Sequence, residues 1–377
     1  MKNKQNGFSL IELMIGMVIG LIAALVITNV LSNYEKQKRS TTGNSDAQTN
    51  GAIALYNIQR DIESAGWGLP TFGEELSPFL CPLSNLSASN TEINHDGIAG
   101  TPNIGLSPVV ISDGTGTNGS DVISIRYGNT MKSGGIVLVT APGANVLTVE
   151  NNLGCRVGDA AIVMRYAAPA PQICQMTRVT ALSAAAVTPV TITLDATTAP
   201  AAVQNKDEVA CLGIWNEFQY AIGGAGATLN QLTRTGALSA GGVPVATPAV
   251  AIVPDIVSLQ AQYGVTNDLI SNQVASWVDA SGGVWGPTIT LGNRNRIKAI
   301  RLAVVARSGL REPFAVSQTC TGGAANLARV CIWNNTSDVN LAGPADWANY
   351  RYRVYETIVP LRNVIWSRKV INGEFLN

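Results

Sequence analysis

The sequence is poor in the residues that catalysis and charge recognition use most. Charged residues make up only 13% of its 377 residues, and 25 basic side chains balance 25 acidic ones. Without an excess of positive charge the chain has no overall field that would attract nucleic acid. The single histidine, His95, excludes HExxH zinc sites, multi-histidine iron sites and most imidazole general bases. A main role in nucleic-acid binding and an ordinary metallohydrolase activity are therefore disfavoured.

Motifs of common catalytic classes are missing as well. The chain has no GxSxG nucleophile elbow, no glycine-rich phosphate loop ending in Gly-Lys-Ser/Thr and no CxxC pair. Hydrophobic residues account for 46% of the chain, which also holds 37 glycines, a composition that is typical of a compact, turn-rich exported protein. We expect a protein that is not an enzyme and that uses no cofactor.

Two Asp/Asn-rich turns have part of the pattern of a calcium loop. The first, DGTGTNGSD, contains Asp113, Asn118 and Asp121, and the second contains Asn267 and Asp268. Oxygen donors at short alternating spacing are what Ca²⁺ requires, but no glutamate closes the first loop at the EF-hand distance. Clusters of this kind are more often plain turns. Calcium is therefore a minor alternative to the absence of any metal.

The longest apolar segment lies at the N-terminus. Lys2 and Lys4 precede an apolar run from Phe8 to Leu31, which as a helix measures about 36 Å and is long enough to span a bilayer. The run is too long for a cleaved secretory signal, and no small-residue cleavage site closes it. We expect a permanent anchor, with the basic leader in the cytoplasm and the remainder exported.

Glu12 does not suit a plain anchor, because a carboxylate in an apolar helix is costly unless it is paired or lies near the interface. Cleavage after Gly7 would leave a free α-amino group on Phe8, one helical turn from Glu12, and that cation could compensate the carboxylate within or between subunits. The stretch KNKQNGFSLIELMIGMVIG resembles a type IV prepilin leader. The resemblance implies that a prepilin peptidase cuts between Gly7 and Phe8, that the new amine of Phe8 is methylated, and that Glu12 guides docking into a growing filament.

After the anchor the chain is expected to continue as an amphipathic helix. Leu55, Ile58, Ile62 and Ala65 follow one another at steps of three and four residues, which places them on one helix face. The expected fold class is α+β, with a long N-terminal helix that carries a mainly antiparallel β-sheet domain with long loops. The predicted organisation is a leader at 1–7, a transmembrane or filament-core helix at 8–33, an amphipathic helix at 34–65 and an exported β-rich domain at 66–377.

The remainder of the sequence has the pattern of β-strands separated by Gly-, Pro-, Asn- and Thr-rich stretches. Three glycine- and Ser/Thr/Asn-rich segments, 83–120, 223–251 and 319–348, are predicted to be long surface loops. The last strand, at 350–360, carries apolar residues on both faces and is predicted to be central. The predicted strands are 121–127, 135–140, 146–150, 160–166, 173–180, 190–194, 211–222, 256–265, 296–307 and 350–360.

All six cysteines lie beyond the anchor, on the side that is predicted to be oxidising, and their even number suits disulfides. Six cysteines allow fifteen connectivities, so the sequence does not settle the pairing. The favoured pairs are Cys320 with Cys331 across a short glycine-containing loop, Cys155 with Cys174 as a weaker local choice, and by default Cys81 with Cys211.

Four further segments resemble the PilW family of type IV pilus minor pilins. The resemblance covers both ends of the chain and leaves about 76–251 uncovered, and it implies a low-abundance subunit that primes pilus polymerisation in a minor-pilin complex and sits at the pilus tip. The segments are ALYNIQRDIESAGWG at 54–68, LQAQYGV at 259–265, RIKAIRLAVVARS at 296–308 and YRYRVYETIVPLRN at 350–363.

The same resemblance implies the partners and the location. The partners would be other minor pilins, the major pilin, a large tip adhesin, the prepilin peptidase and the inner-membrane assembly platform. The protein would cross the inner membrane once with its C-terminal domain in the periplasm, and later lie in a pilus on the surface of a Gram-negative bacterium. Two alternatives stay open, namely a J-type minor pseudopilin of type II secretion and a membrane-anchored adhesin.

Overall fold

The structure is a computed structural model, in which one long helix precedes a series of β-sheets. Gly7, Phe8, Cys81 and His95 lie outside the described residues, as does the side chain of Cys174. The described residues are 9–69, 107–130, 135–165, 173–184, 187–196, 199, 203–226, 229–238, 244–245, 249–268, 271–286, 291–333, 337–341 and 345–364.

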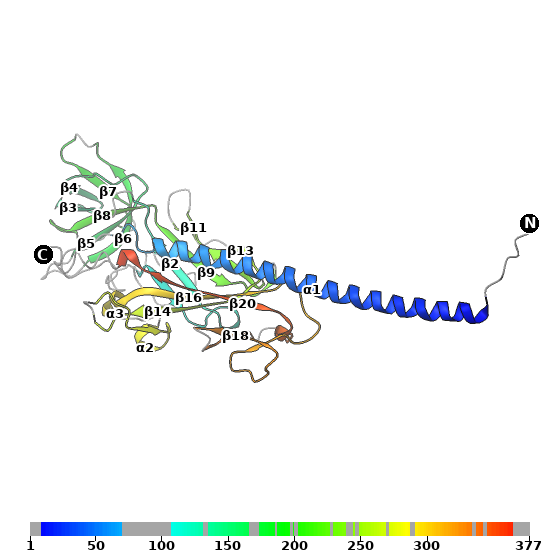
Figure 1. The fold of residues 1–377 in the computed structure, drawn as a ribbon. Coiled ribbons are helices and arrows are strands. Elements are labelled where there is room, and N and C mark those ends of the chain that lie inside the picture. The colour runs from blue at the N-terminus through cyan, green and yellow to red at the C-terminus, as the bar shows by residue number, and fades with distance from the viewer. Residues whose placement is uncertain are drawn as a thin grey trace, which may run out of the picture.

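Helix α1 (Leu10–Ser64) runs without a break through the weak helix formers Thr41 and Gly43. Ser9 caps its N-terminus, because the Ser9 hydroxyl accepts a hydrogen bond from the backbone N–H of Ile11. Its end at Ser64 is followed by Gly66 with a φ of 77°, a left-handed conformation that glycine adopts without steric cost. In Figure 1 the first half of α1 projects away from the sheets and the second half lies across them.

Two antiparallel sheets lie beneath the second half of α1 (Figure 1). The first has the strand order β1 (Val109–Ser112), β2 (Val122–Tyr127), β9 (Asn216–Ile222), β10 (Gln231–Thr235) and β13 (Val250–Pro254). The second has the order β15 (Ser276–Val278), β14 (Ile256–Val265), β16 (Ile297–Arg307) and β20 (Tyr352–Pro360).

A closed antiparallel barrel is inserted in the chain between β2 and β9, and it lies at the end of the molecule opposite the projecting half of α1 (Figure 1). Its strands, in order around the barrel, are β3 (Ile136–Ala141), β4 (Val146–Val149), β7 (Thr191–Leu194), β6 (Ile173–Leu182), β5 (Ala160–Arg165) and β8 (Glu208–Gly213). The barrel encloses an apolar core of its own that includes Val139, Leu147 and Val209.

Shorter elements complete the fold around these sheets. A small sheet of β17, β18 and β19 packs beside β20 and forms a third apolar cluster with it. The short elements are the 3-10 helices η3 (Thr117–Gly119) and η5 (Trp347–Asn349), the helices α2 (Gly282–Trp285) and α3 (Leu291–Arg296), and the strands β11 (Ala237–Leu238), β12 (Pro244–Val245), β17 (Ser317–Thr319), β18 (Ala328–Ile332) and β19 (Ser337–Asp338).

The prediction that the last strand is central is wrong, because β20 lies at the edge of its sheet. Both of its faces carry apolar side chains for a different reason. Tyr355 packs against the main core beneath α1, whereas Tyr352 and Val354 pack on the third cluster. A strand covered on both faces has the same sequence pattern whether or not a further strand pairs with it.

Two other predictions of local structure are corrected. The segment predicted as a single strand at 211–222 contains the end of β8 and the whole of β9, because β8 ends at Gly213, where φ is 75°. The segments 83–120, 223–251 and 319–348, predicted to be loops, contain short strands, among them β1 in the described part of the first. These strands have only two to five residues each, which is too few for the sustained apolar alternation on which strand prediction depends.

Candidate assembly site

The first half of α1 leaves its apolar surface open. Within the described residues α1 is the one helix long and apolar enough to cross a membrane, and none of its apolar window is buried. Leu10 is 80% exposed at its start and Leu31 is 56% exposed at its end. An apolar surface of this extent is stable only in a bilayer or against other apolar helices. We call residues 10–31 the exposed half of α1.

Glu12 lies in the first turn of this exposed half and is itself exposed. Its backbone N–H donates to the carbonyl oxygen of Ser9 at 3.0 Å. A carboxylate in the first helical turn interacts favourably with the positive end of the helix dipole. Among the described residues Glu12 has no ion pair, so a cation for it would come from the rest of the chain or from outside the subunit.

Three small residues, Gly16, Gly20 and Ala24, follow Glu12 at steps of four. A Cβ atom added at Gly16 or Gly20 would meet nothing within 4 Å in the described structure. Small residues at this spacing allow a second helix to approach closely in an apolar environment. The subunit therefore has no internal need for glycine at these two positions.

The second half of α1 is fixed to the two sheets by small and branched apolar residues. Ala47, Ala54, Ile58 and Ile62 are all buried at this contact. Gly51 permits the closest approach, because a Cβ atom there would overlap the ring of Tyr355 and lie 3.2 Å from the Cβ atom of Ala306. The helix therefore rests directly on β16 and β20.

A buried polar joint fixes the end of α1 to the first sheet. The carboxylate of Asp61, which is 3% exposed, accepts a 2.6 Å hydrogen bond from the Tyr220 hydroxyl and lies 3.1 Å from a guanidinium nitrogen of Arg234. The Arg234 guanidinium stacks over the ring of Phe218 at 3.5 Å. Burial and the hydrogen bond to Asp61 raise the pKa of Tyr220 well above its usual value, so its hydroxyl remains a donor at physiological pH.

Backbone groups just after the C-terminal end of α1 form hydrogen bonds with residues far along the chain. The side-chain amide of Asn363 donates to the carbonyl oxygen of Ala65 at 2.8 Å, and the backbone N–H of Gly66 donates to the carbonyl oxygen of Arg126. These bonds satisfy backbone groups that a helix end leaves open. Asn363 belongs to a segment that the sequence singled out, but its contact was not foreseeable from local pattern.

The side chains of the two calcium candidates have protein partners. Asp121 is buried, and its two carboxylate oxygens accept hydrogen bonds from the backbone N–H groups of Gly114 and Ala261 at 2.8 and 2.7 Å. The Asp268 carboxylate accepts a hydrogen bond from the backbone N–H of Ser271. No group of three or more His, Cys, Asp or Glu side chains suited to a metal occurs among the described residues.

Two disulfides are present in the described structure. Cys320 is bonded to Cys331, in agreement with the prediction. Cys155 is bonded to Cys211, and this pair replaces both the predicted Cys155–Cys174 bond and the default partner of Cys211. The barrel explains the difference, because it brings the loop before β5 next to β8 although the two cysteines are 56 residues apart.

The side chains that hold α1 are clustered in one part of the sequence. Residues 219–363 match the family model of type IV pilus-assembly protein W. Residues 2–28 match the prokaryotic N-terminal methylation motif. The resemblance to the PilW family is thereby confirmed, and the two matches support a type IV pilus-related pilin with a membrane-anchoring N-terminus. No curated protein and no solved structure gives a significant match to the chain.

The PilW match contains most of the side chains described above that hold the second half of α1. Tyr220, Arg234, Tyr355 and Asn363 all lie within 219–363. The barrel strands lie outside it, in the part of the chain that the resemblance did not cover. The matched region therefore supplies most of the two sheets beneath α1, which β1 and β2 complete, and the barrel is inserted between β2 and β9.

Proposed function

We propose that this protein is a type IV pilus minor pilin that primes polymerisation in a minor-pilin complex at the pilus tip, as a structural subunit rather than an enzyme. The exposed half of α1 carries the proposal. It joins a class III methylation motif to a domain that matches a pilus-assembly family, and its apolar surface is left uncovered by that domain. A helix of this kind leaves the bilayer only by packing against similar helices.

A second exposed area on α1 supports packing against neighbouring subunits. Ile53 and Tyr56 are 46% and 63% exposed, although the opposite face of α1 at this level is buried against the sheets. The proposed neighbours are other minor pilins and the major pilin, with a large adhesin beyond them at the tip. Before assembly the subunit would stand in the inner membrane with its sheets and barrel in the periplasm, and afterwards at the cell surface.

In this proposal the peptidase cuts between Gly7 and Phe8, and the α-amino group of a mature Phe8 pairs with Glu12 of the same or a neighbouring subunit. The test is to determine the N-terminal residue and the mass of the protein purified from membranes and from sheared filaments. A methylated Phe8 in the filament fraction is expected, and Gly7→Ala should leave an unprocessed, membrane-held chain. Recovery of intact Met1 from wild-type cells would contradict the proposal.

The role of Glu12 is tested separately. Glu12→Gln should be cleaved normally yet enter filaments less efficiently, because the neutral amide does not attract the ammonium group of a neighbour. Asp46→Asn, at an exposed position further along α1, is the matched control. Equal pilus numbers with both variants would remove Glu12 from the mechanism but would leave the processing step intact.

The row of small residues gives a further test of helix packing. Gly20→Val fits the isolated subunit, since nothing lies within 4 Å of the added Cβ atom. A normal level of protein with fewer pili would therefore indicate that a helix of a neighbouring subunit packs against this position. Normal piliation with Gly20→Val would place the helix contact on another face.

A further inference from the structure

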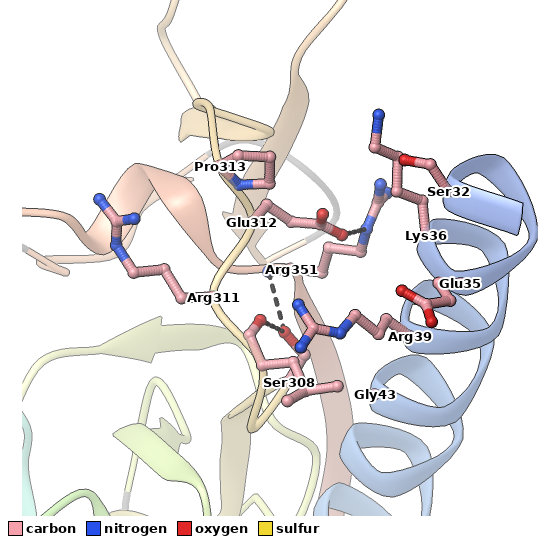
Figure 2. A pocket seen from close by; sticks show the side chains of 11 residues that line it. Ser32, Glu35, Lys36, Arg39, Gly43, Ser308, Arg311, Glu312, Pro313 and Arg351 are labelled. Carbon is pink, nitrogen blue, oxygen red and sulfur yellow. Dashed lines mark hydrogen bonds and ion pairs between the residues drawn. The ribbon is translucent and has the colours of Figure 1, made fainter. Parts of the chain in front are cut away.

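A cleft of about 430 Å³ lies where the exposed half of α1 meets the domain. One wall is α1, from Ser32 to Gly43, and the other is the loop that follows β16, at 308–313, together with Arg351. Figure 2 shows the two walls close together at Gly43 and Ser308 and apart at the end nearest Ser32. The cleft therefore opens toward the membrane-anchoring end of the helix.

The walls of the cleft are held in place by contacts within the protein. A Cβ atom at Gly43 would lie 3.2 Å from the Cβ atom of Ser308, so glycine allows the loop to approach the helix. The backbone N–H of Ser308 donates to the carbonyl oxygen of Arg351 at 2.8 Å, and the Arg351 guanidinium pairs with Glu312 at 3.0 Å. The site is thus formed before any ligand arrives.

The cleft carries an excess of positive charge. Arg351 is neutralised by Glu312, and Arg311 pairs with Asp346 at 2.7 Å. Among the described residues no ion pair involves the remaining cations, Lys36 and Arg39, and one carboxylate, that of Glu35, stands beside them on α1. Two cations and one carboxylate leave a single net positive charge.

The two basic side chains border the open space of the cleft, and Lys36 extends toward the anchor. Figure 2 shows Arg39 extending from α1 into the cleft toward Ser308, and Lys36 extending along the helix toward Ser32. Side chains on a helix incline toward its N-terminus, which here is the direction of the membrane. Long basic side chains can extend in this way to reach a lipid headgroup while their backbone lies outside the bilayer.

The cleft lies along the axis of α1 at about the level expected for the lipid headgroups. The apolar run ends at Leu31, and Lys36 and Arg39 follow it by about 7.5 and 12 Å along the helix axis at 1.5 Å per residue. The headgroup region adds about 5 to 8 Å to each side of a hydrocarbon core of about 30 Å. Lys36 therefore lies at the depth of the headgroups of the outer leaflet of the membrane, and Arg39 lies about 4 to 7 Å beyond them, a distance within the length of its side chain.

We infer that this cleft binds the phosphate group of an anionic phospholipid from the periplasmic leaflet while the subunit waits in the membrane. The single net positive charge matches a lipid with one net negative charge, such as a phosphatidylglycerol, better than a zwitterionic lipid. In this inference the Lys36 ammonium and the Arg39 guanidinium contact the phosphate, and the Ser32 hydroxyl lies near the Lys36 side chain. The inference depends on the helix crossing the bilayer and not on filament assembly.

The experiment is a native mass-spectrometric titration of the full-length protein in mild detergent with phosphatidylglycerol, phosphatidylcholine and inorganic phosphate as separate ligands. Lys36→Gln combined with Arg39→Gln should weaken phosphatidylglycerol binding about 30-fold, because each basic side chain near an anionic surface contributes about 1 kcal/mol. Glu35→Gln should strengthen phosphatidylglycerol binding, because it removes the carboxylate that offsets one of the two cations. Phosphatidylcholine and millimolar inorganic phosphate should bind weakly to all forms.

The matched control is Lys38→Gln combined with Arg329→Gln, which removes the same charge from two exposed positions outside the cleft. Lys38 lies on the opposite side of α1 from Lys36 at nearly the same height. Equal weakening by the control pair, equal binding of phosphatidylcholine, or displacement of the lipid by millimolar phosphate would each overturn the inference. Filament counts and the mature N-terminal residue test the proposed function independently of this titration.

Discussion

The hydroxyl of Tyr220 donates a 2.6 Å hydrogen bond to the carboxylate of Asp61, across 159 residues of sequence. This bond joins the end of α1 to β9, and Arg234 supplies the charge partner from β10. The arrangement makes the orientation of the long helix depend on a few polar atoms in an otherwise apolar contact. A subunit whose helix must enter an assembly needs that orientation to be fixed.

Tyr220→Phe should lower the free energy of unfolding by roughly 1–3 kcal/mol, because it leaves a buried carboxylate with one partner fewer. Tyr56→Phe, which removes a hydroxyl from an exposed position on α1, should change stability by less than about 0.5 kcal/mol. Chemical denaturation of the full-length protein in detergent measures both. Similar values for the two variants would show that the Asp61 joint contributes nothing to stability.

Gly51→Ala should destabilise the protein by roughly 1–3 kcal/mol, since the added methyl group overlaps the Tyr355 ring and forces the helix or the ring to move. The effect should shrink in a Tyr355→Ala background, where the obstructing ring is gone. Gln48→Ala, at an exposed position on α1, is the control for helix propensity. A cost that is unchanged in the Tyr355→Ala background would mean that the overlap is not its cause.

The sequence was most informative where a physical pattern is local. The apolar run, Glu12 within it and the three-and-four spacing of Ile58, Ile62 and Ala65 predicted the helix and its buried face. The apolar segments between Gly-, Pro-, Asn- and Thr-rich stretches likewise predicted β14 and β16, which lie at the middle of their sheet. These signals depend only on residues a few positions apart.

What could not be predicted depends on distant parts of the chain. The barrel brings Cys155 to Cys211, and no spacing rule marks that pair above the nearer Cys174. Asp61 lies in the segment 54–68 that resembles the PilW family, but no local pattern marks Tyr220 and Arg234 as its partners. Such contacts arise from strand order, which the apolar pattern of a single strand does not encode.

Removing the Cys155–Cys211 disulfide should lower the free energy of unfolding more than removing the Cys320–Cys331 disulfide. The two bonds close loops with sequence separations of 56 and 11 residues, for which chain entropy gives about 4 and about 3 kcal/mol. Paired substitutions to serine, compared in denaturant titrations, measure the difference. A larger loss from the Cys320/Cys331 pair would show that native-state packing, and not loop closure, sets the contribution.

The buried Asp121 should make stability depend on pH in the direction opposite to that of most carboxylates. Burial raises its pKa from 3.8 to about 7, against the opposing effect of the backbone N–H groups of Gly114 and Ala261, and the nearby Asp113 raises it further. The folded protein then keeps a proton up to about pH 7 that the unfolded chain releases near pH 4. The stabilisation is complete below pH 4 and is lost as the pH rises toward 7.

Asp121→Asn removes this titration, so the free energy of unfolding of the wild type should fall relative to that of the variant between pH 4.5 and 7 by at most about 1.4 kcal/mol per pH unit. The comparison cancels the other carboxylates, which titrate in both proteins, and the exposed Asp46→Asn should follow the wild type. Parallel pH profiles for wild type and Asp121→Asn would contradict the raised pKa. A difference of the opposite sign would mean that the two backbone donors, rather than burial, dominate at this carboxylate.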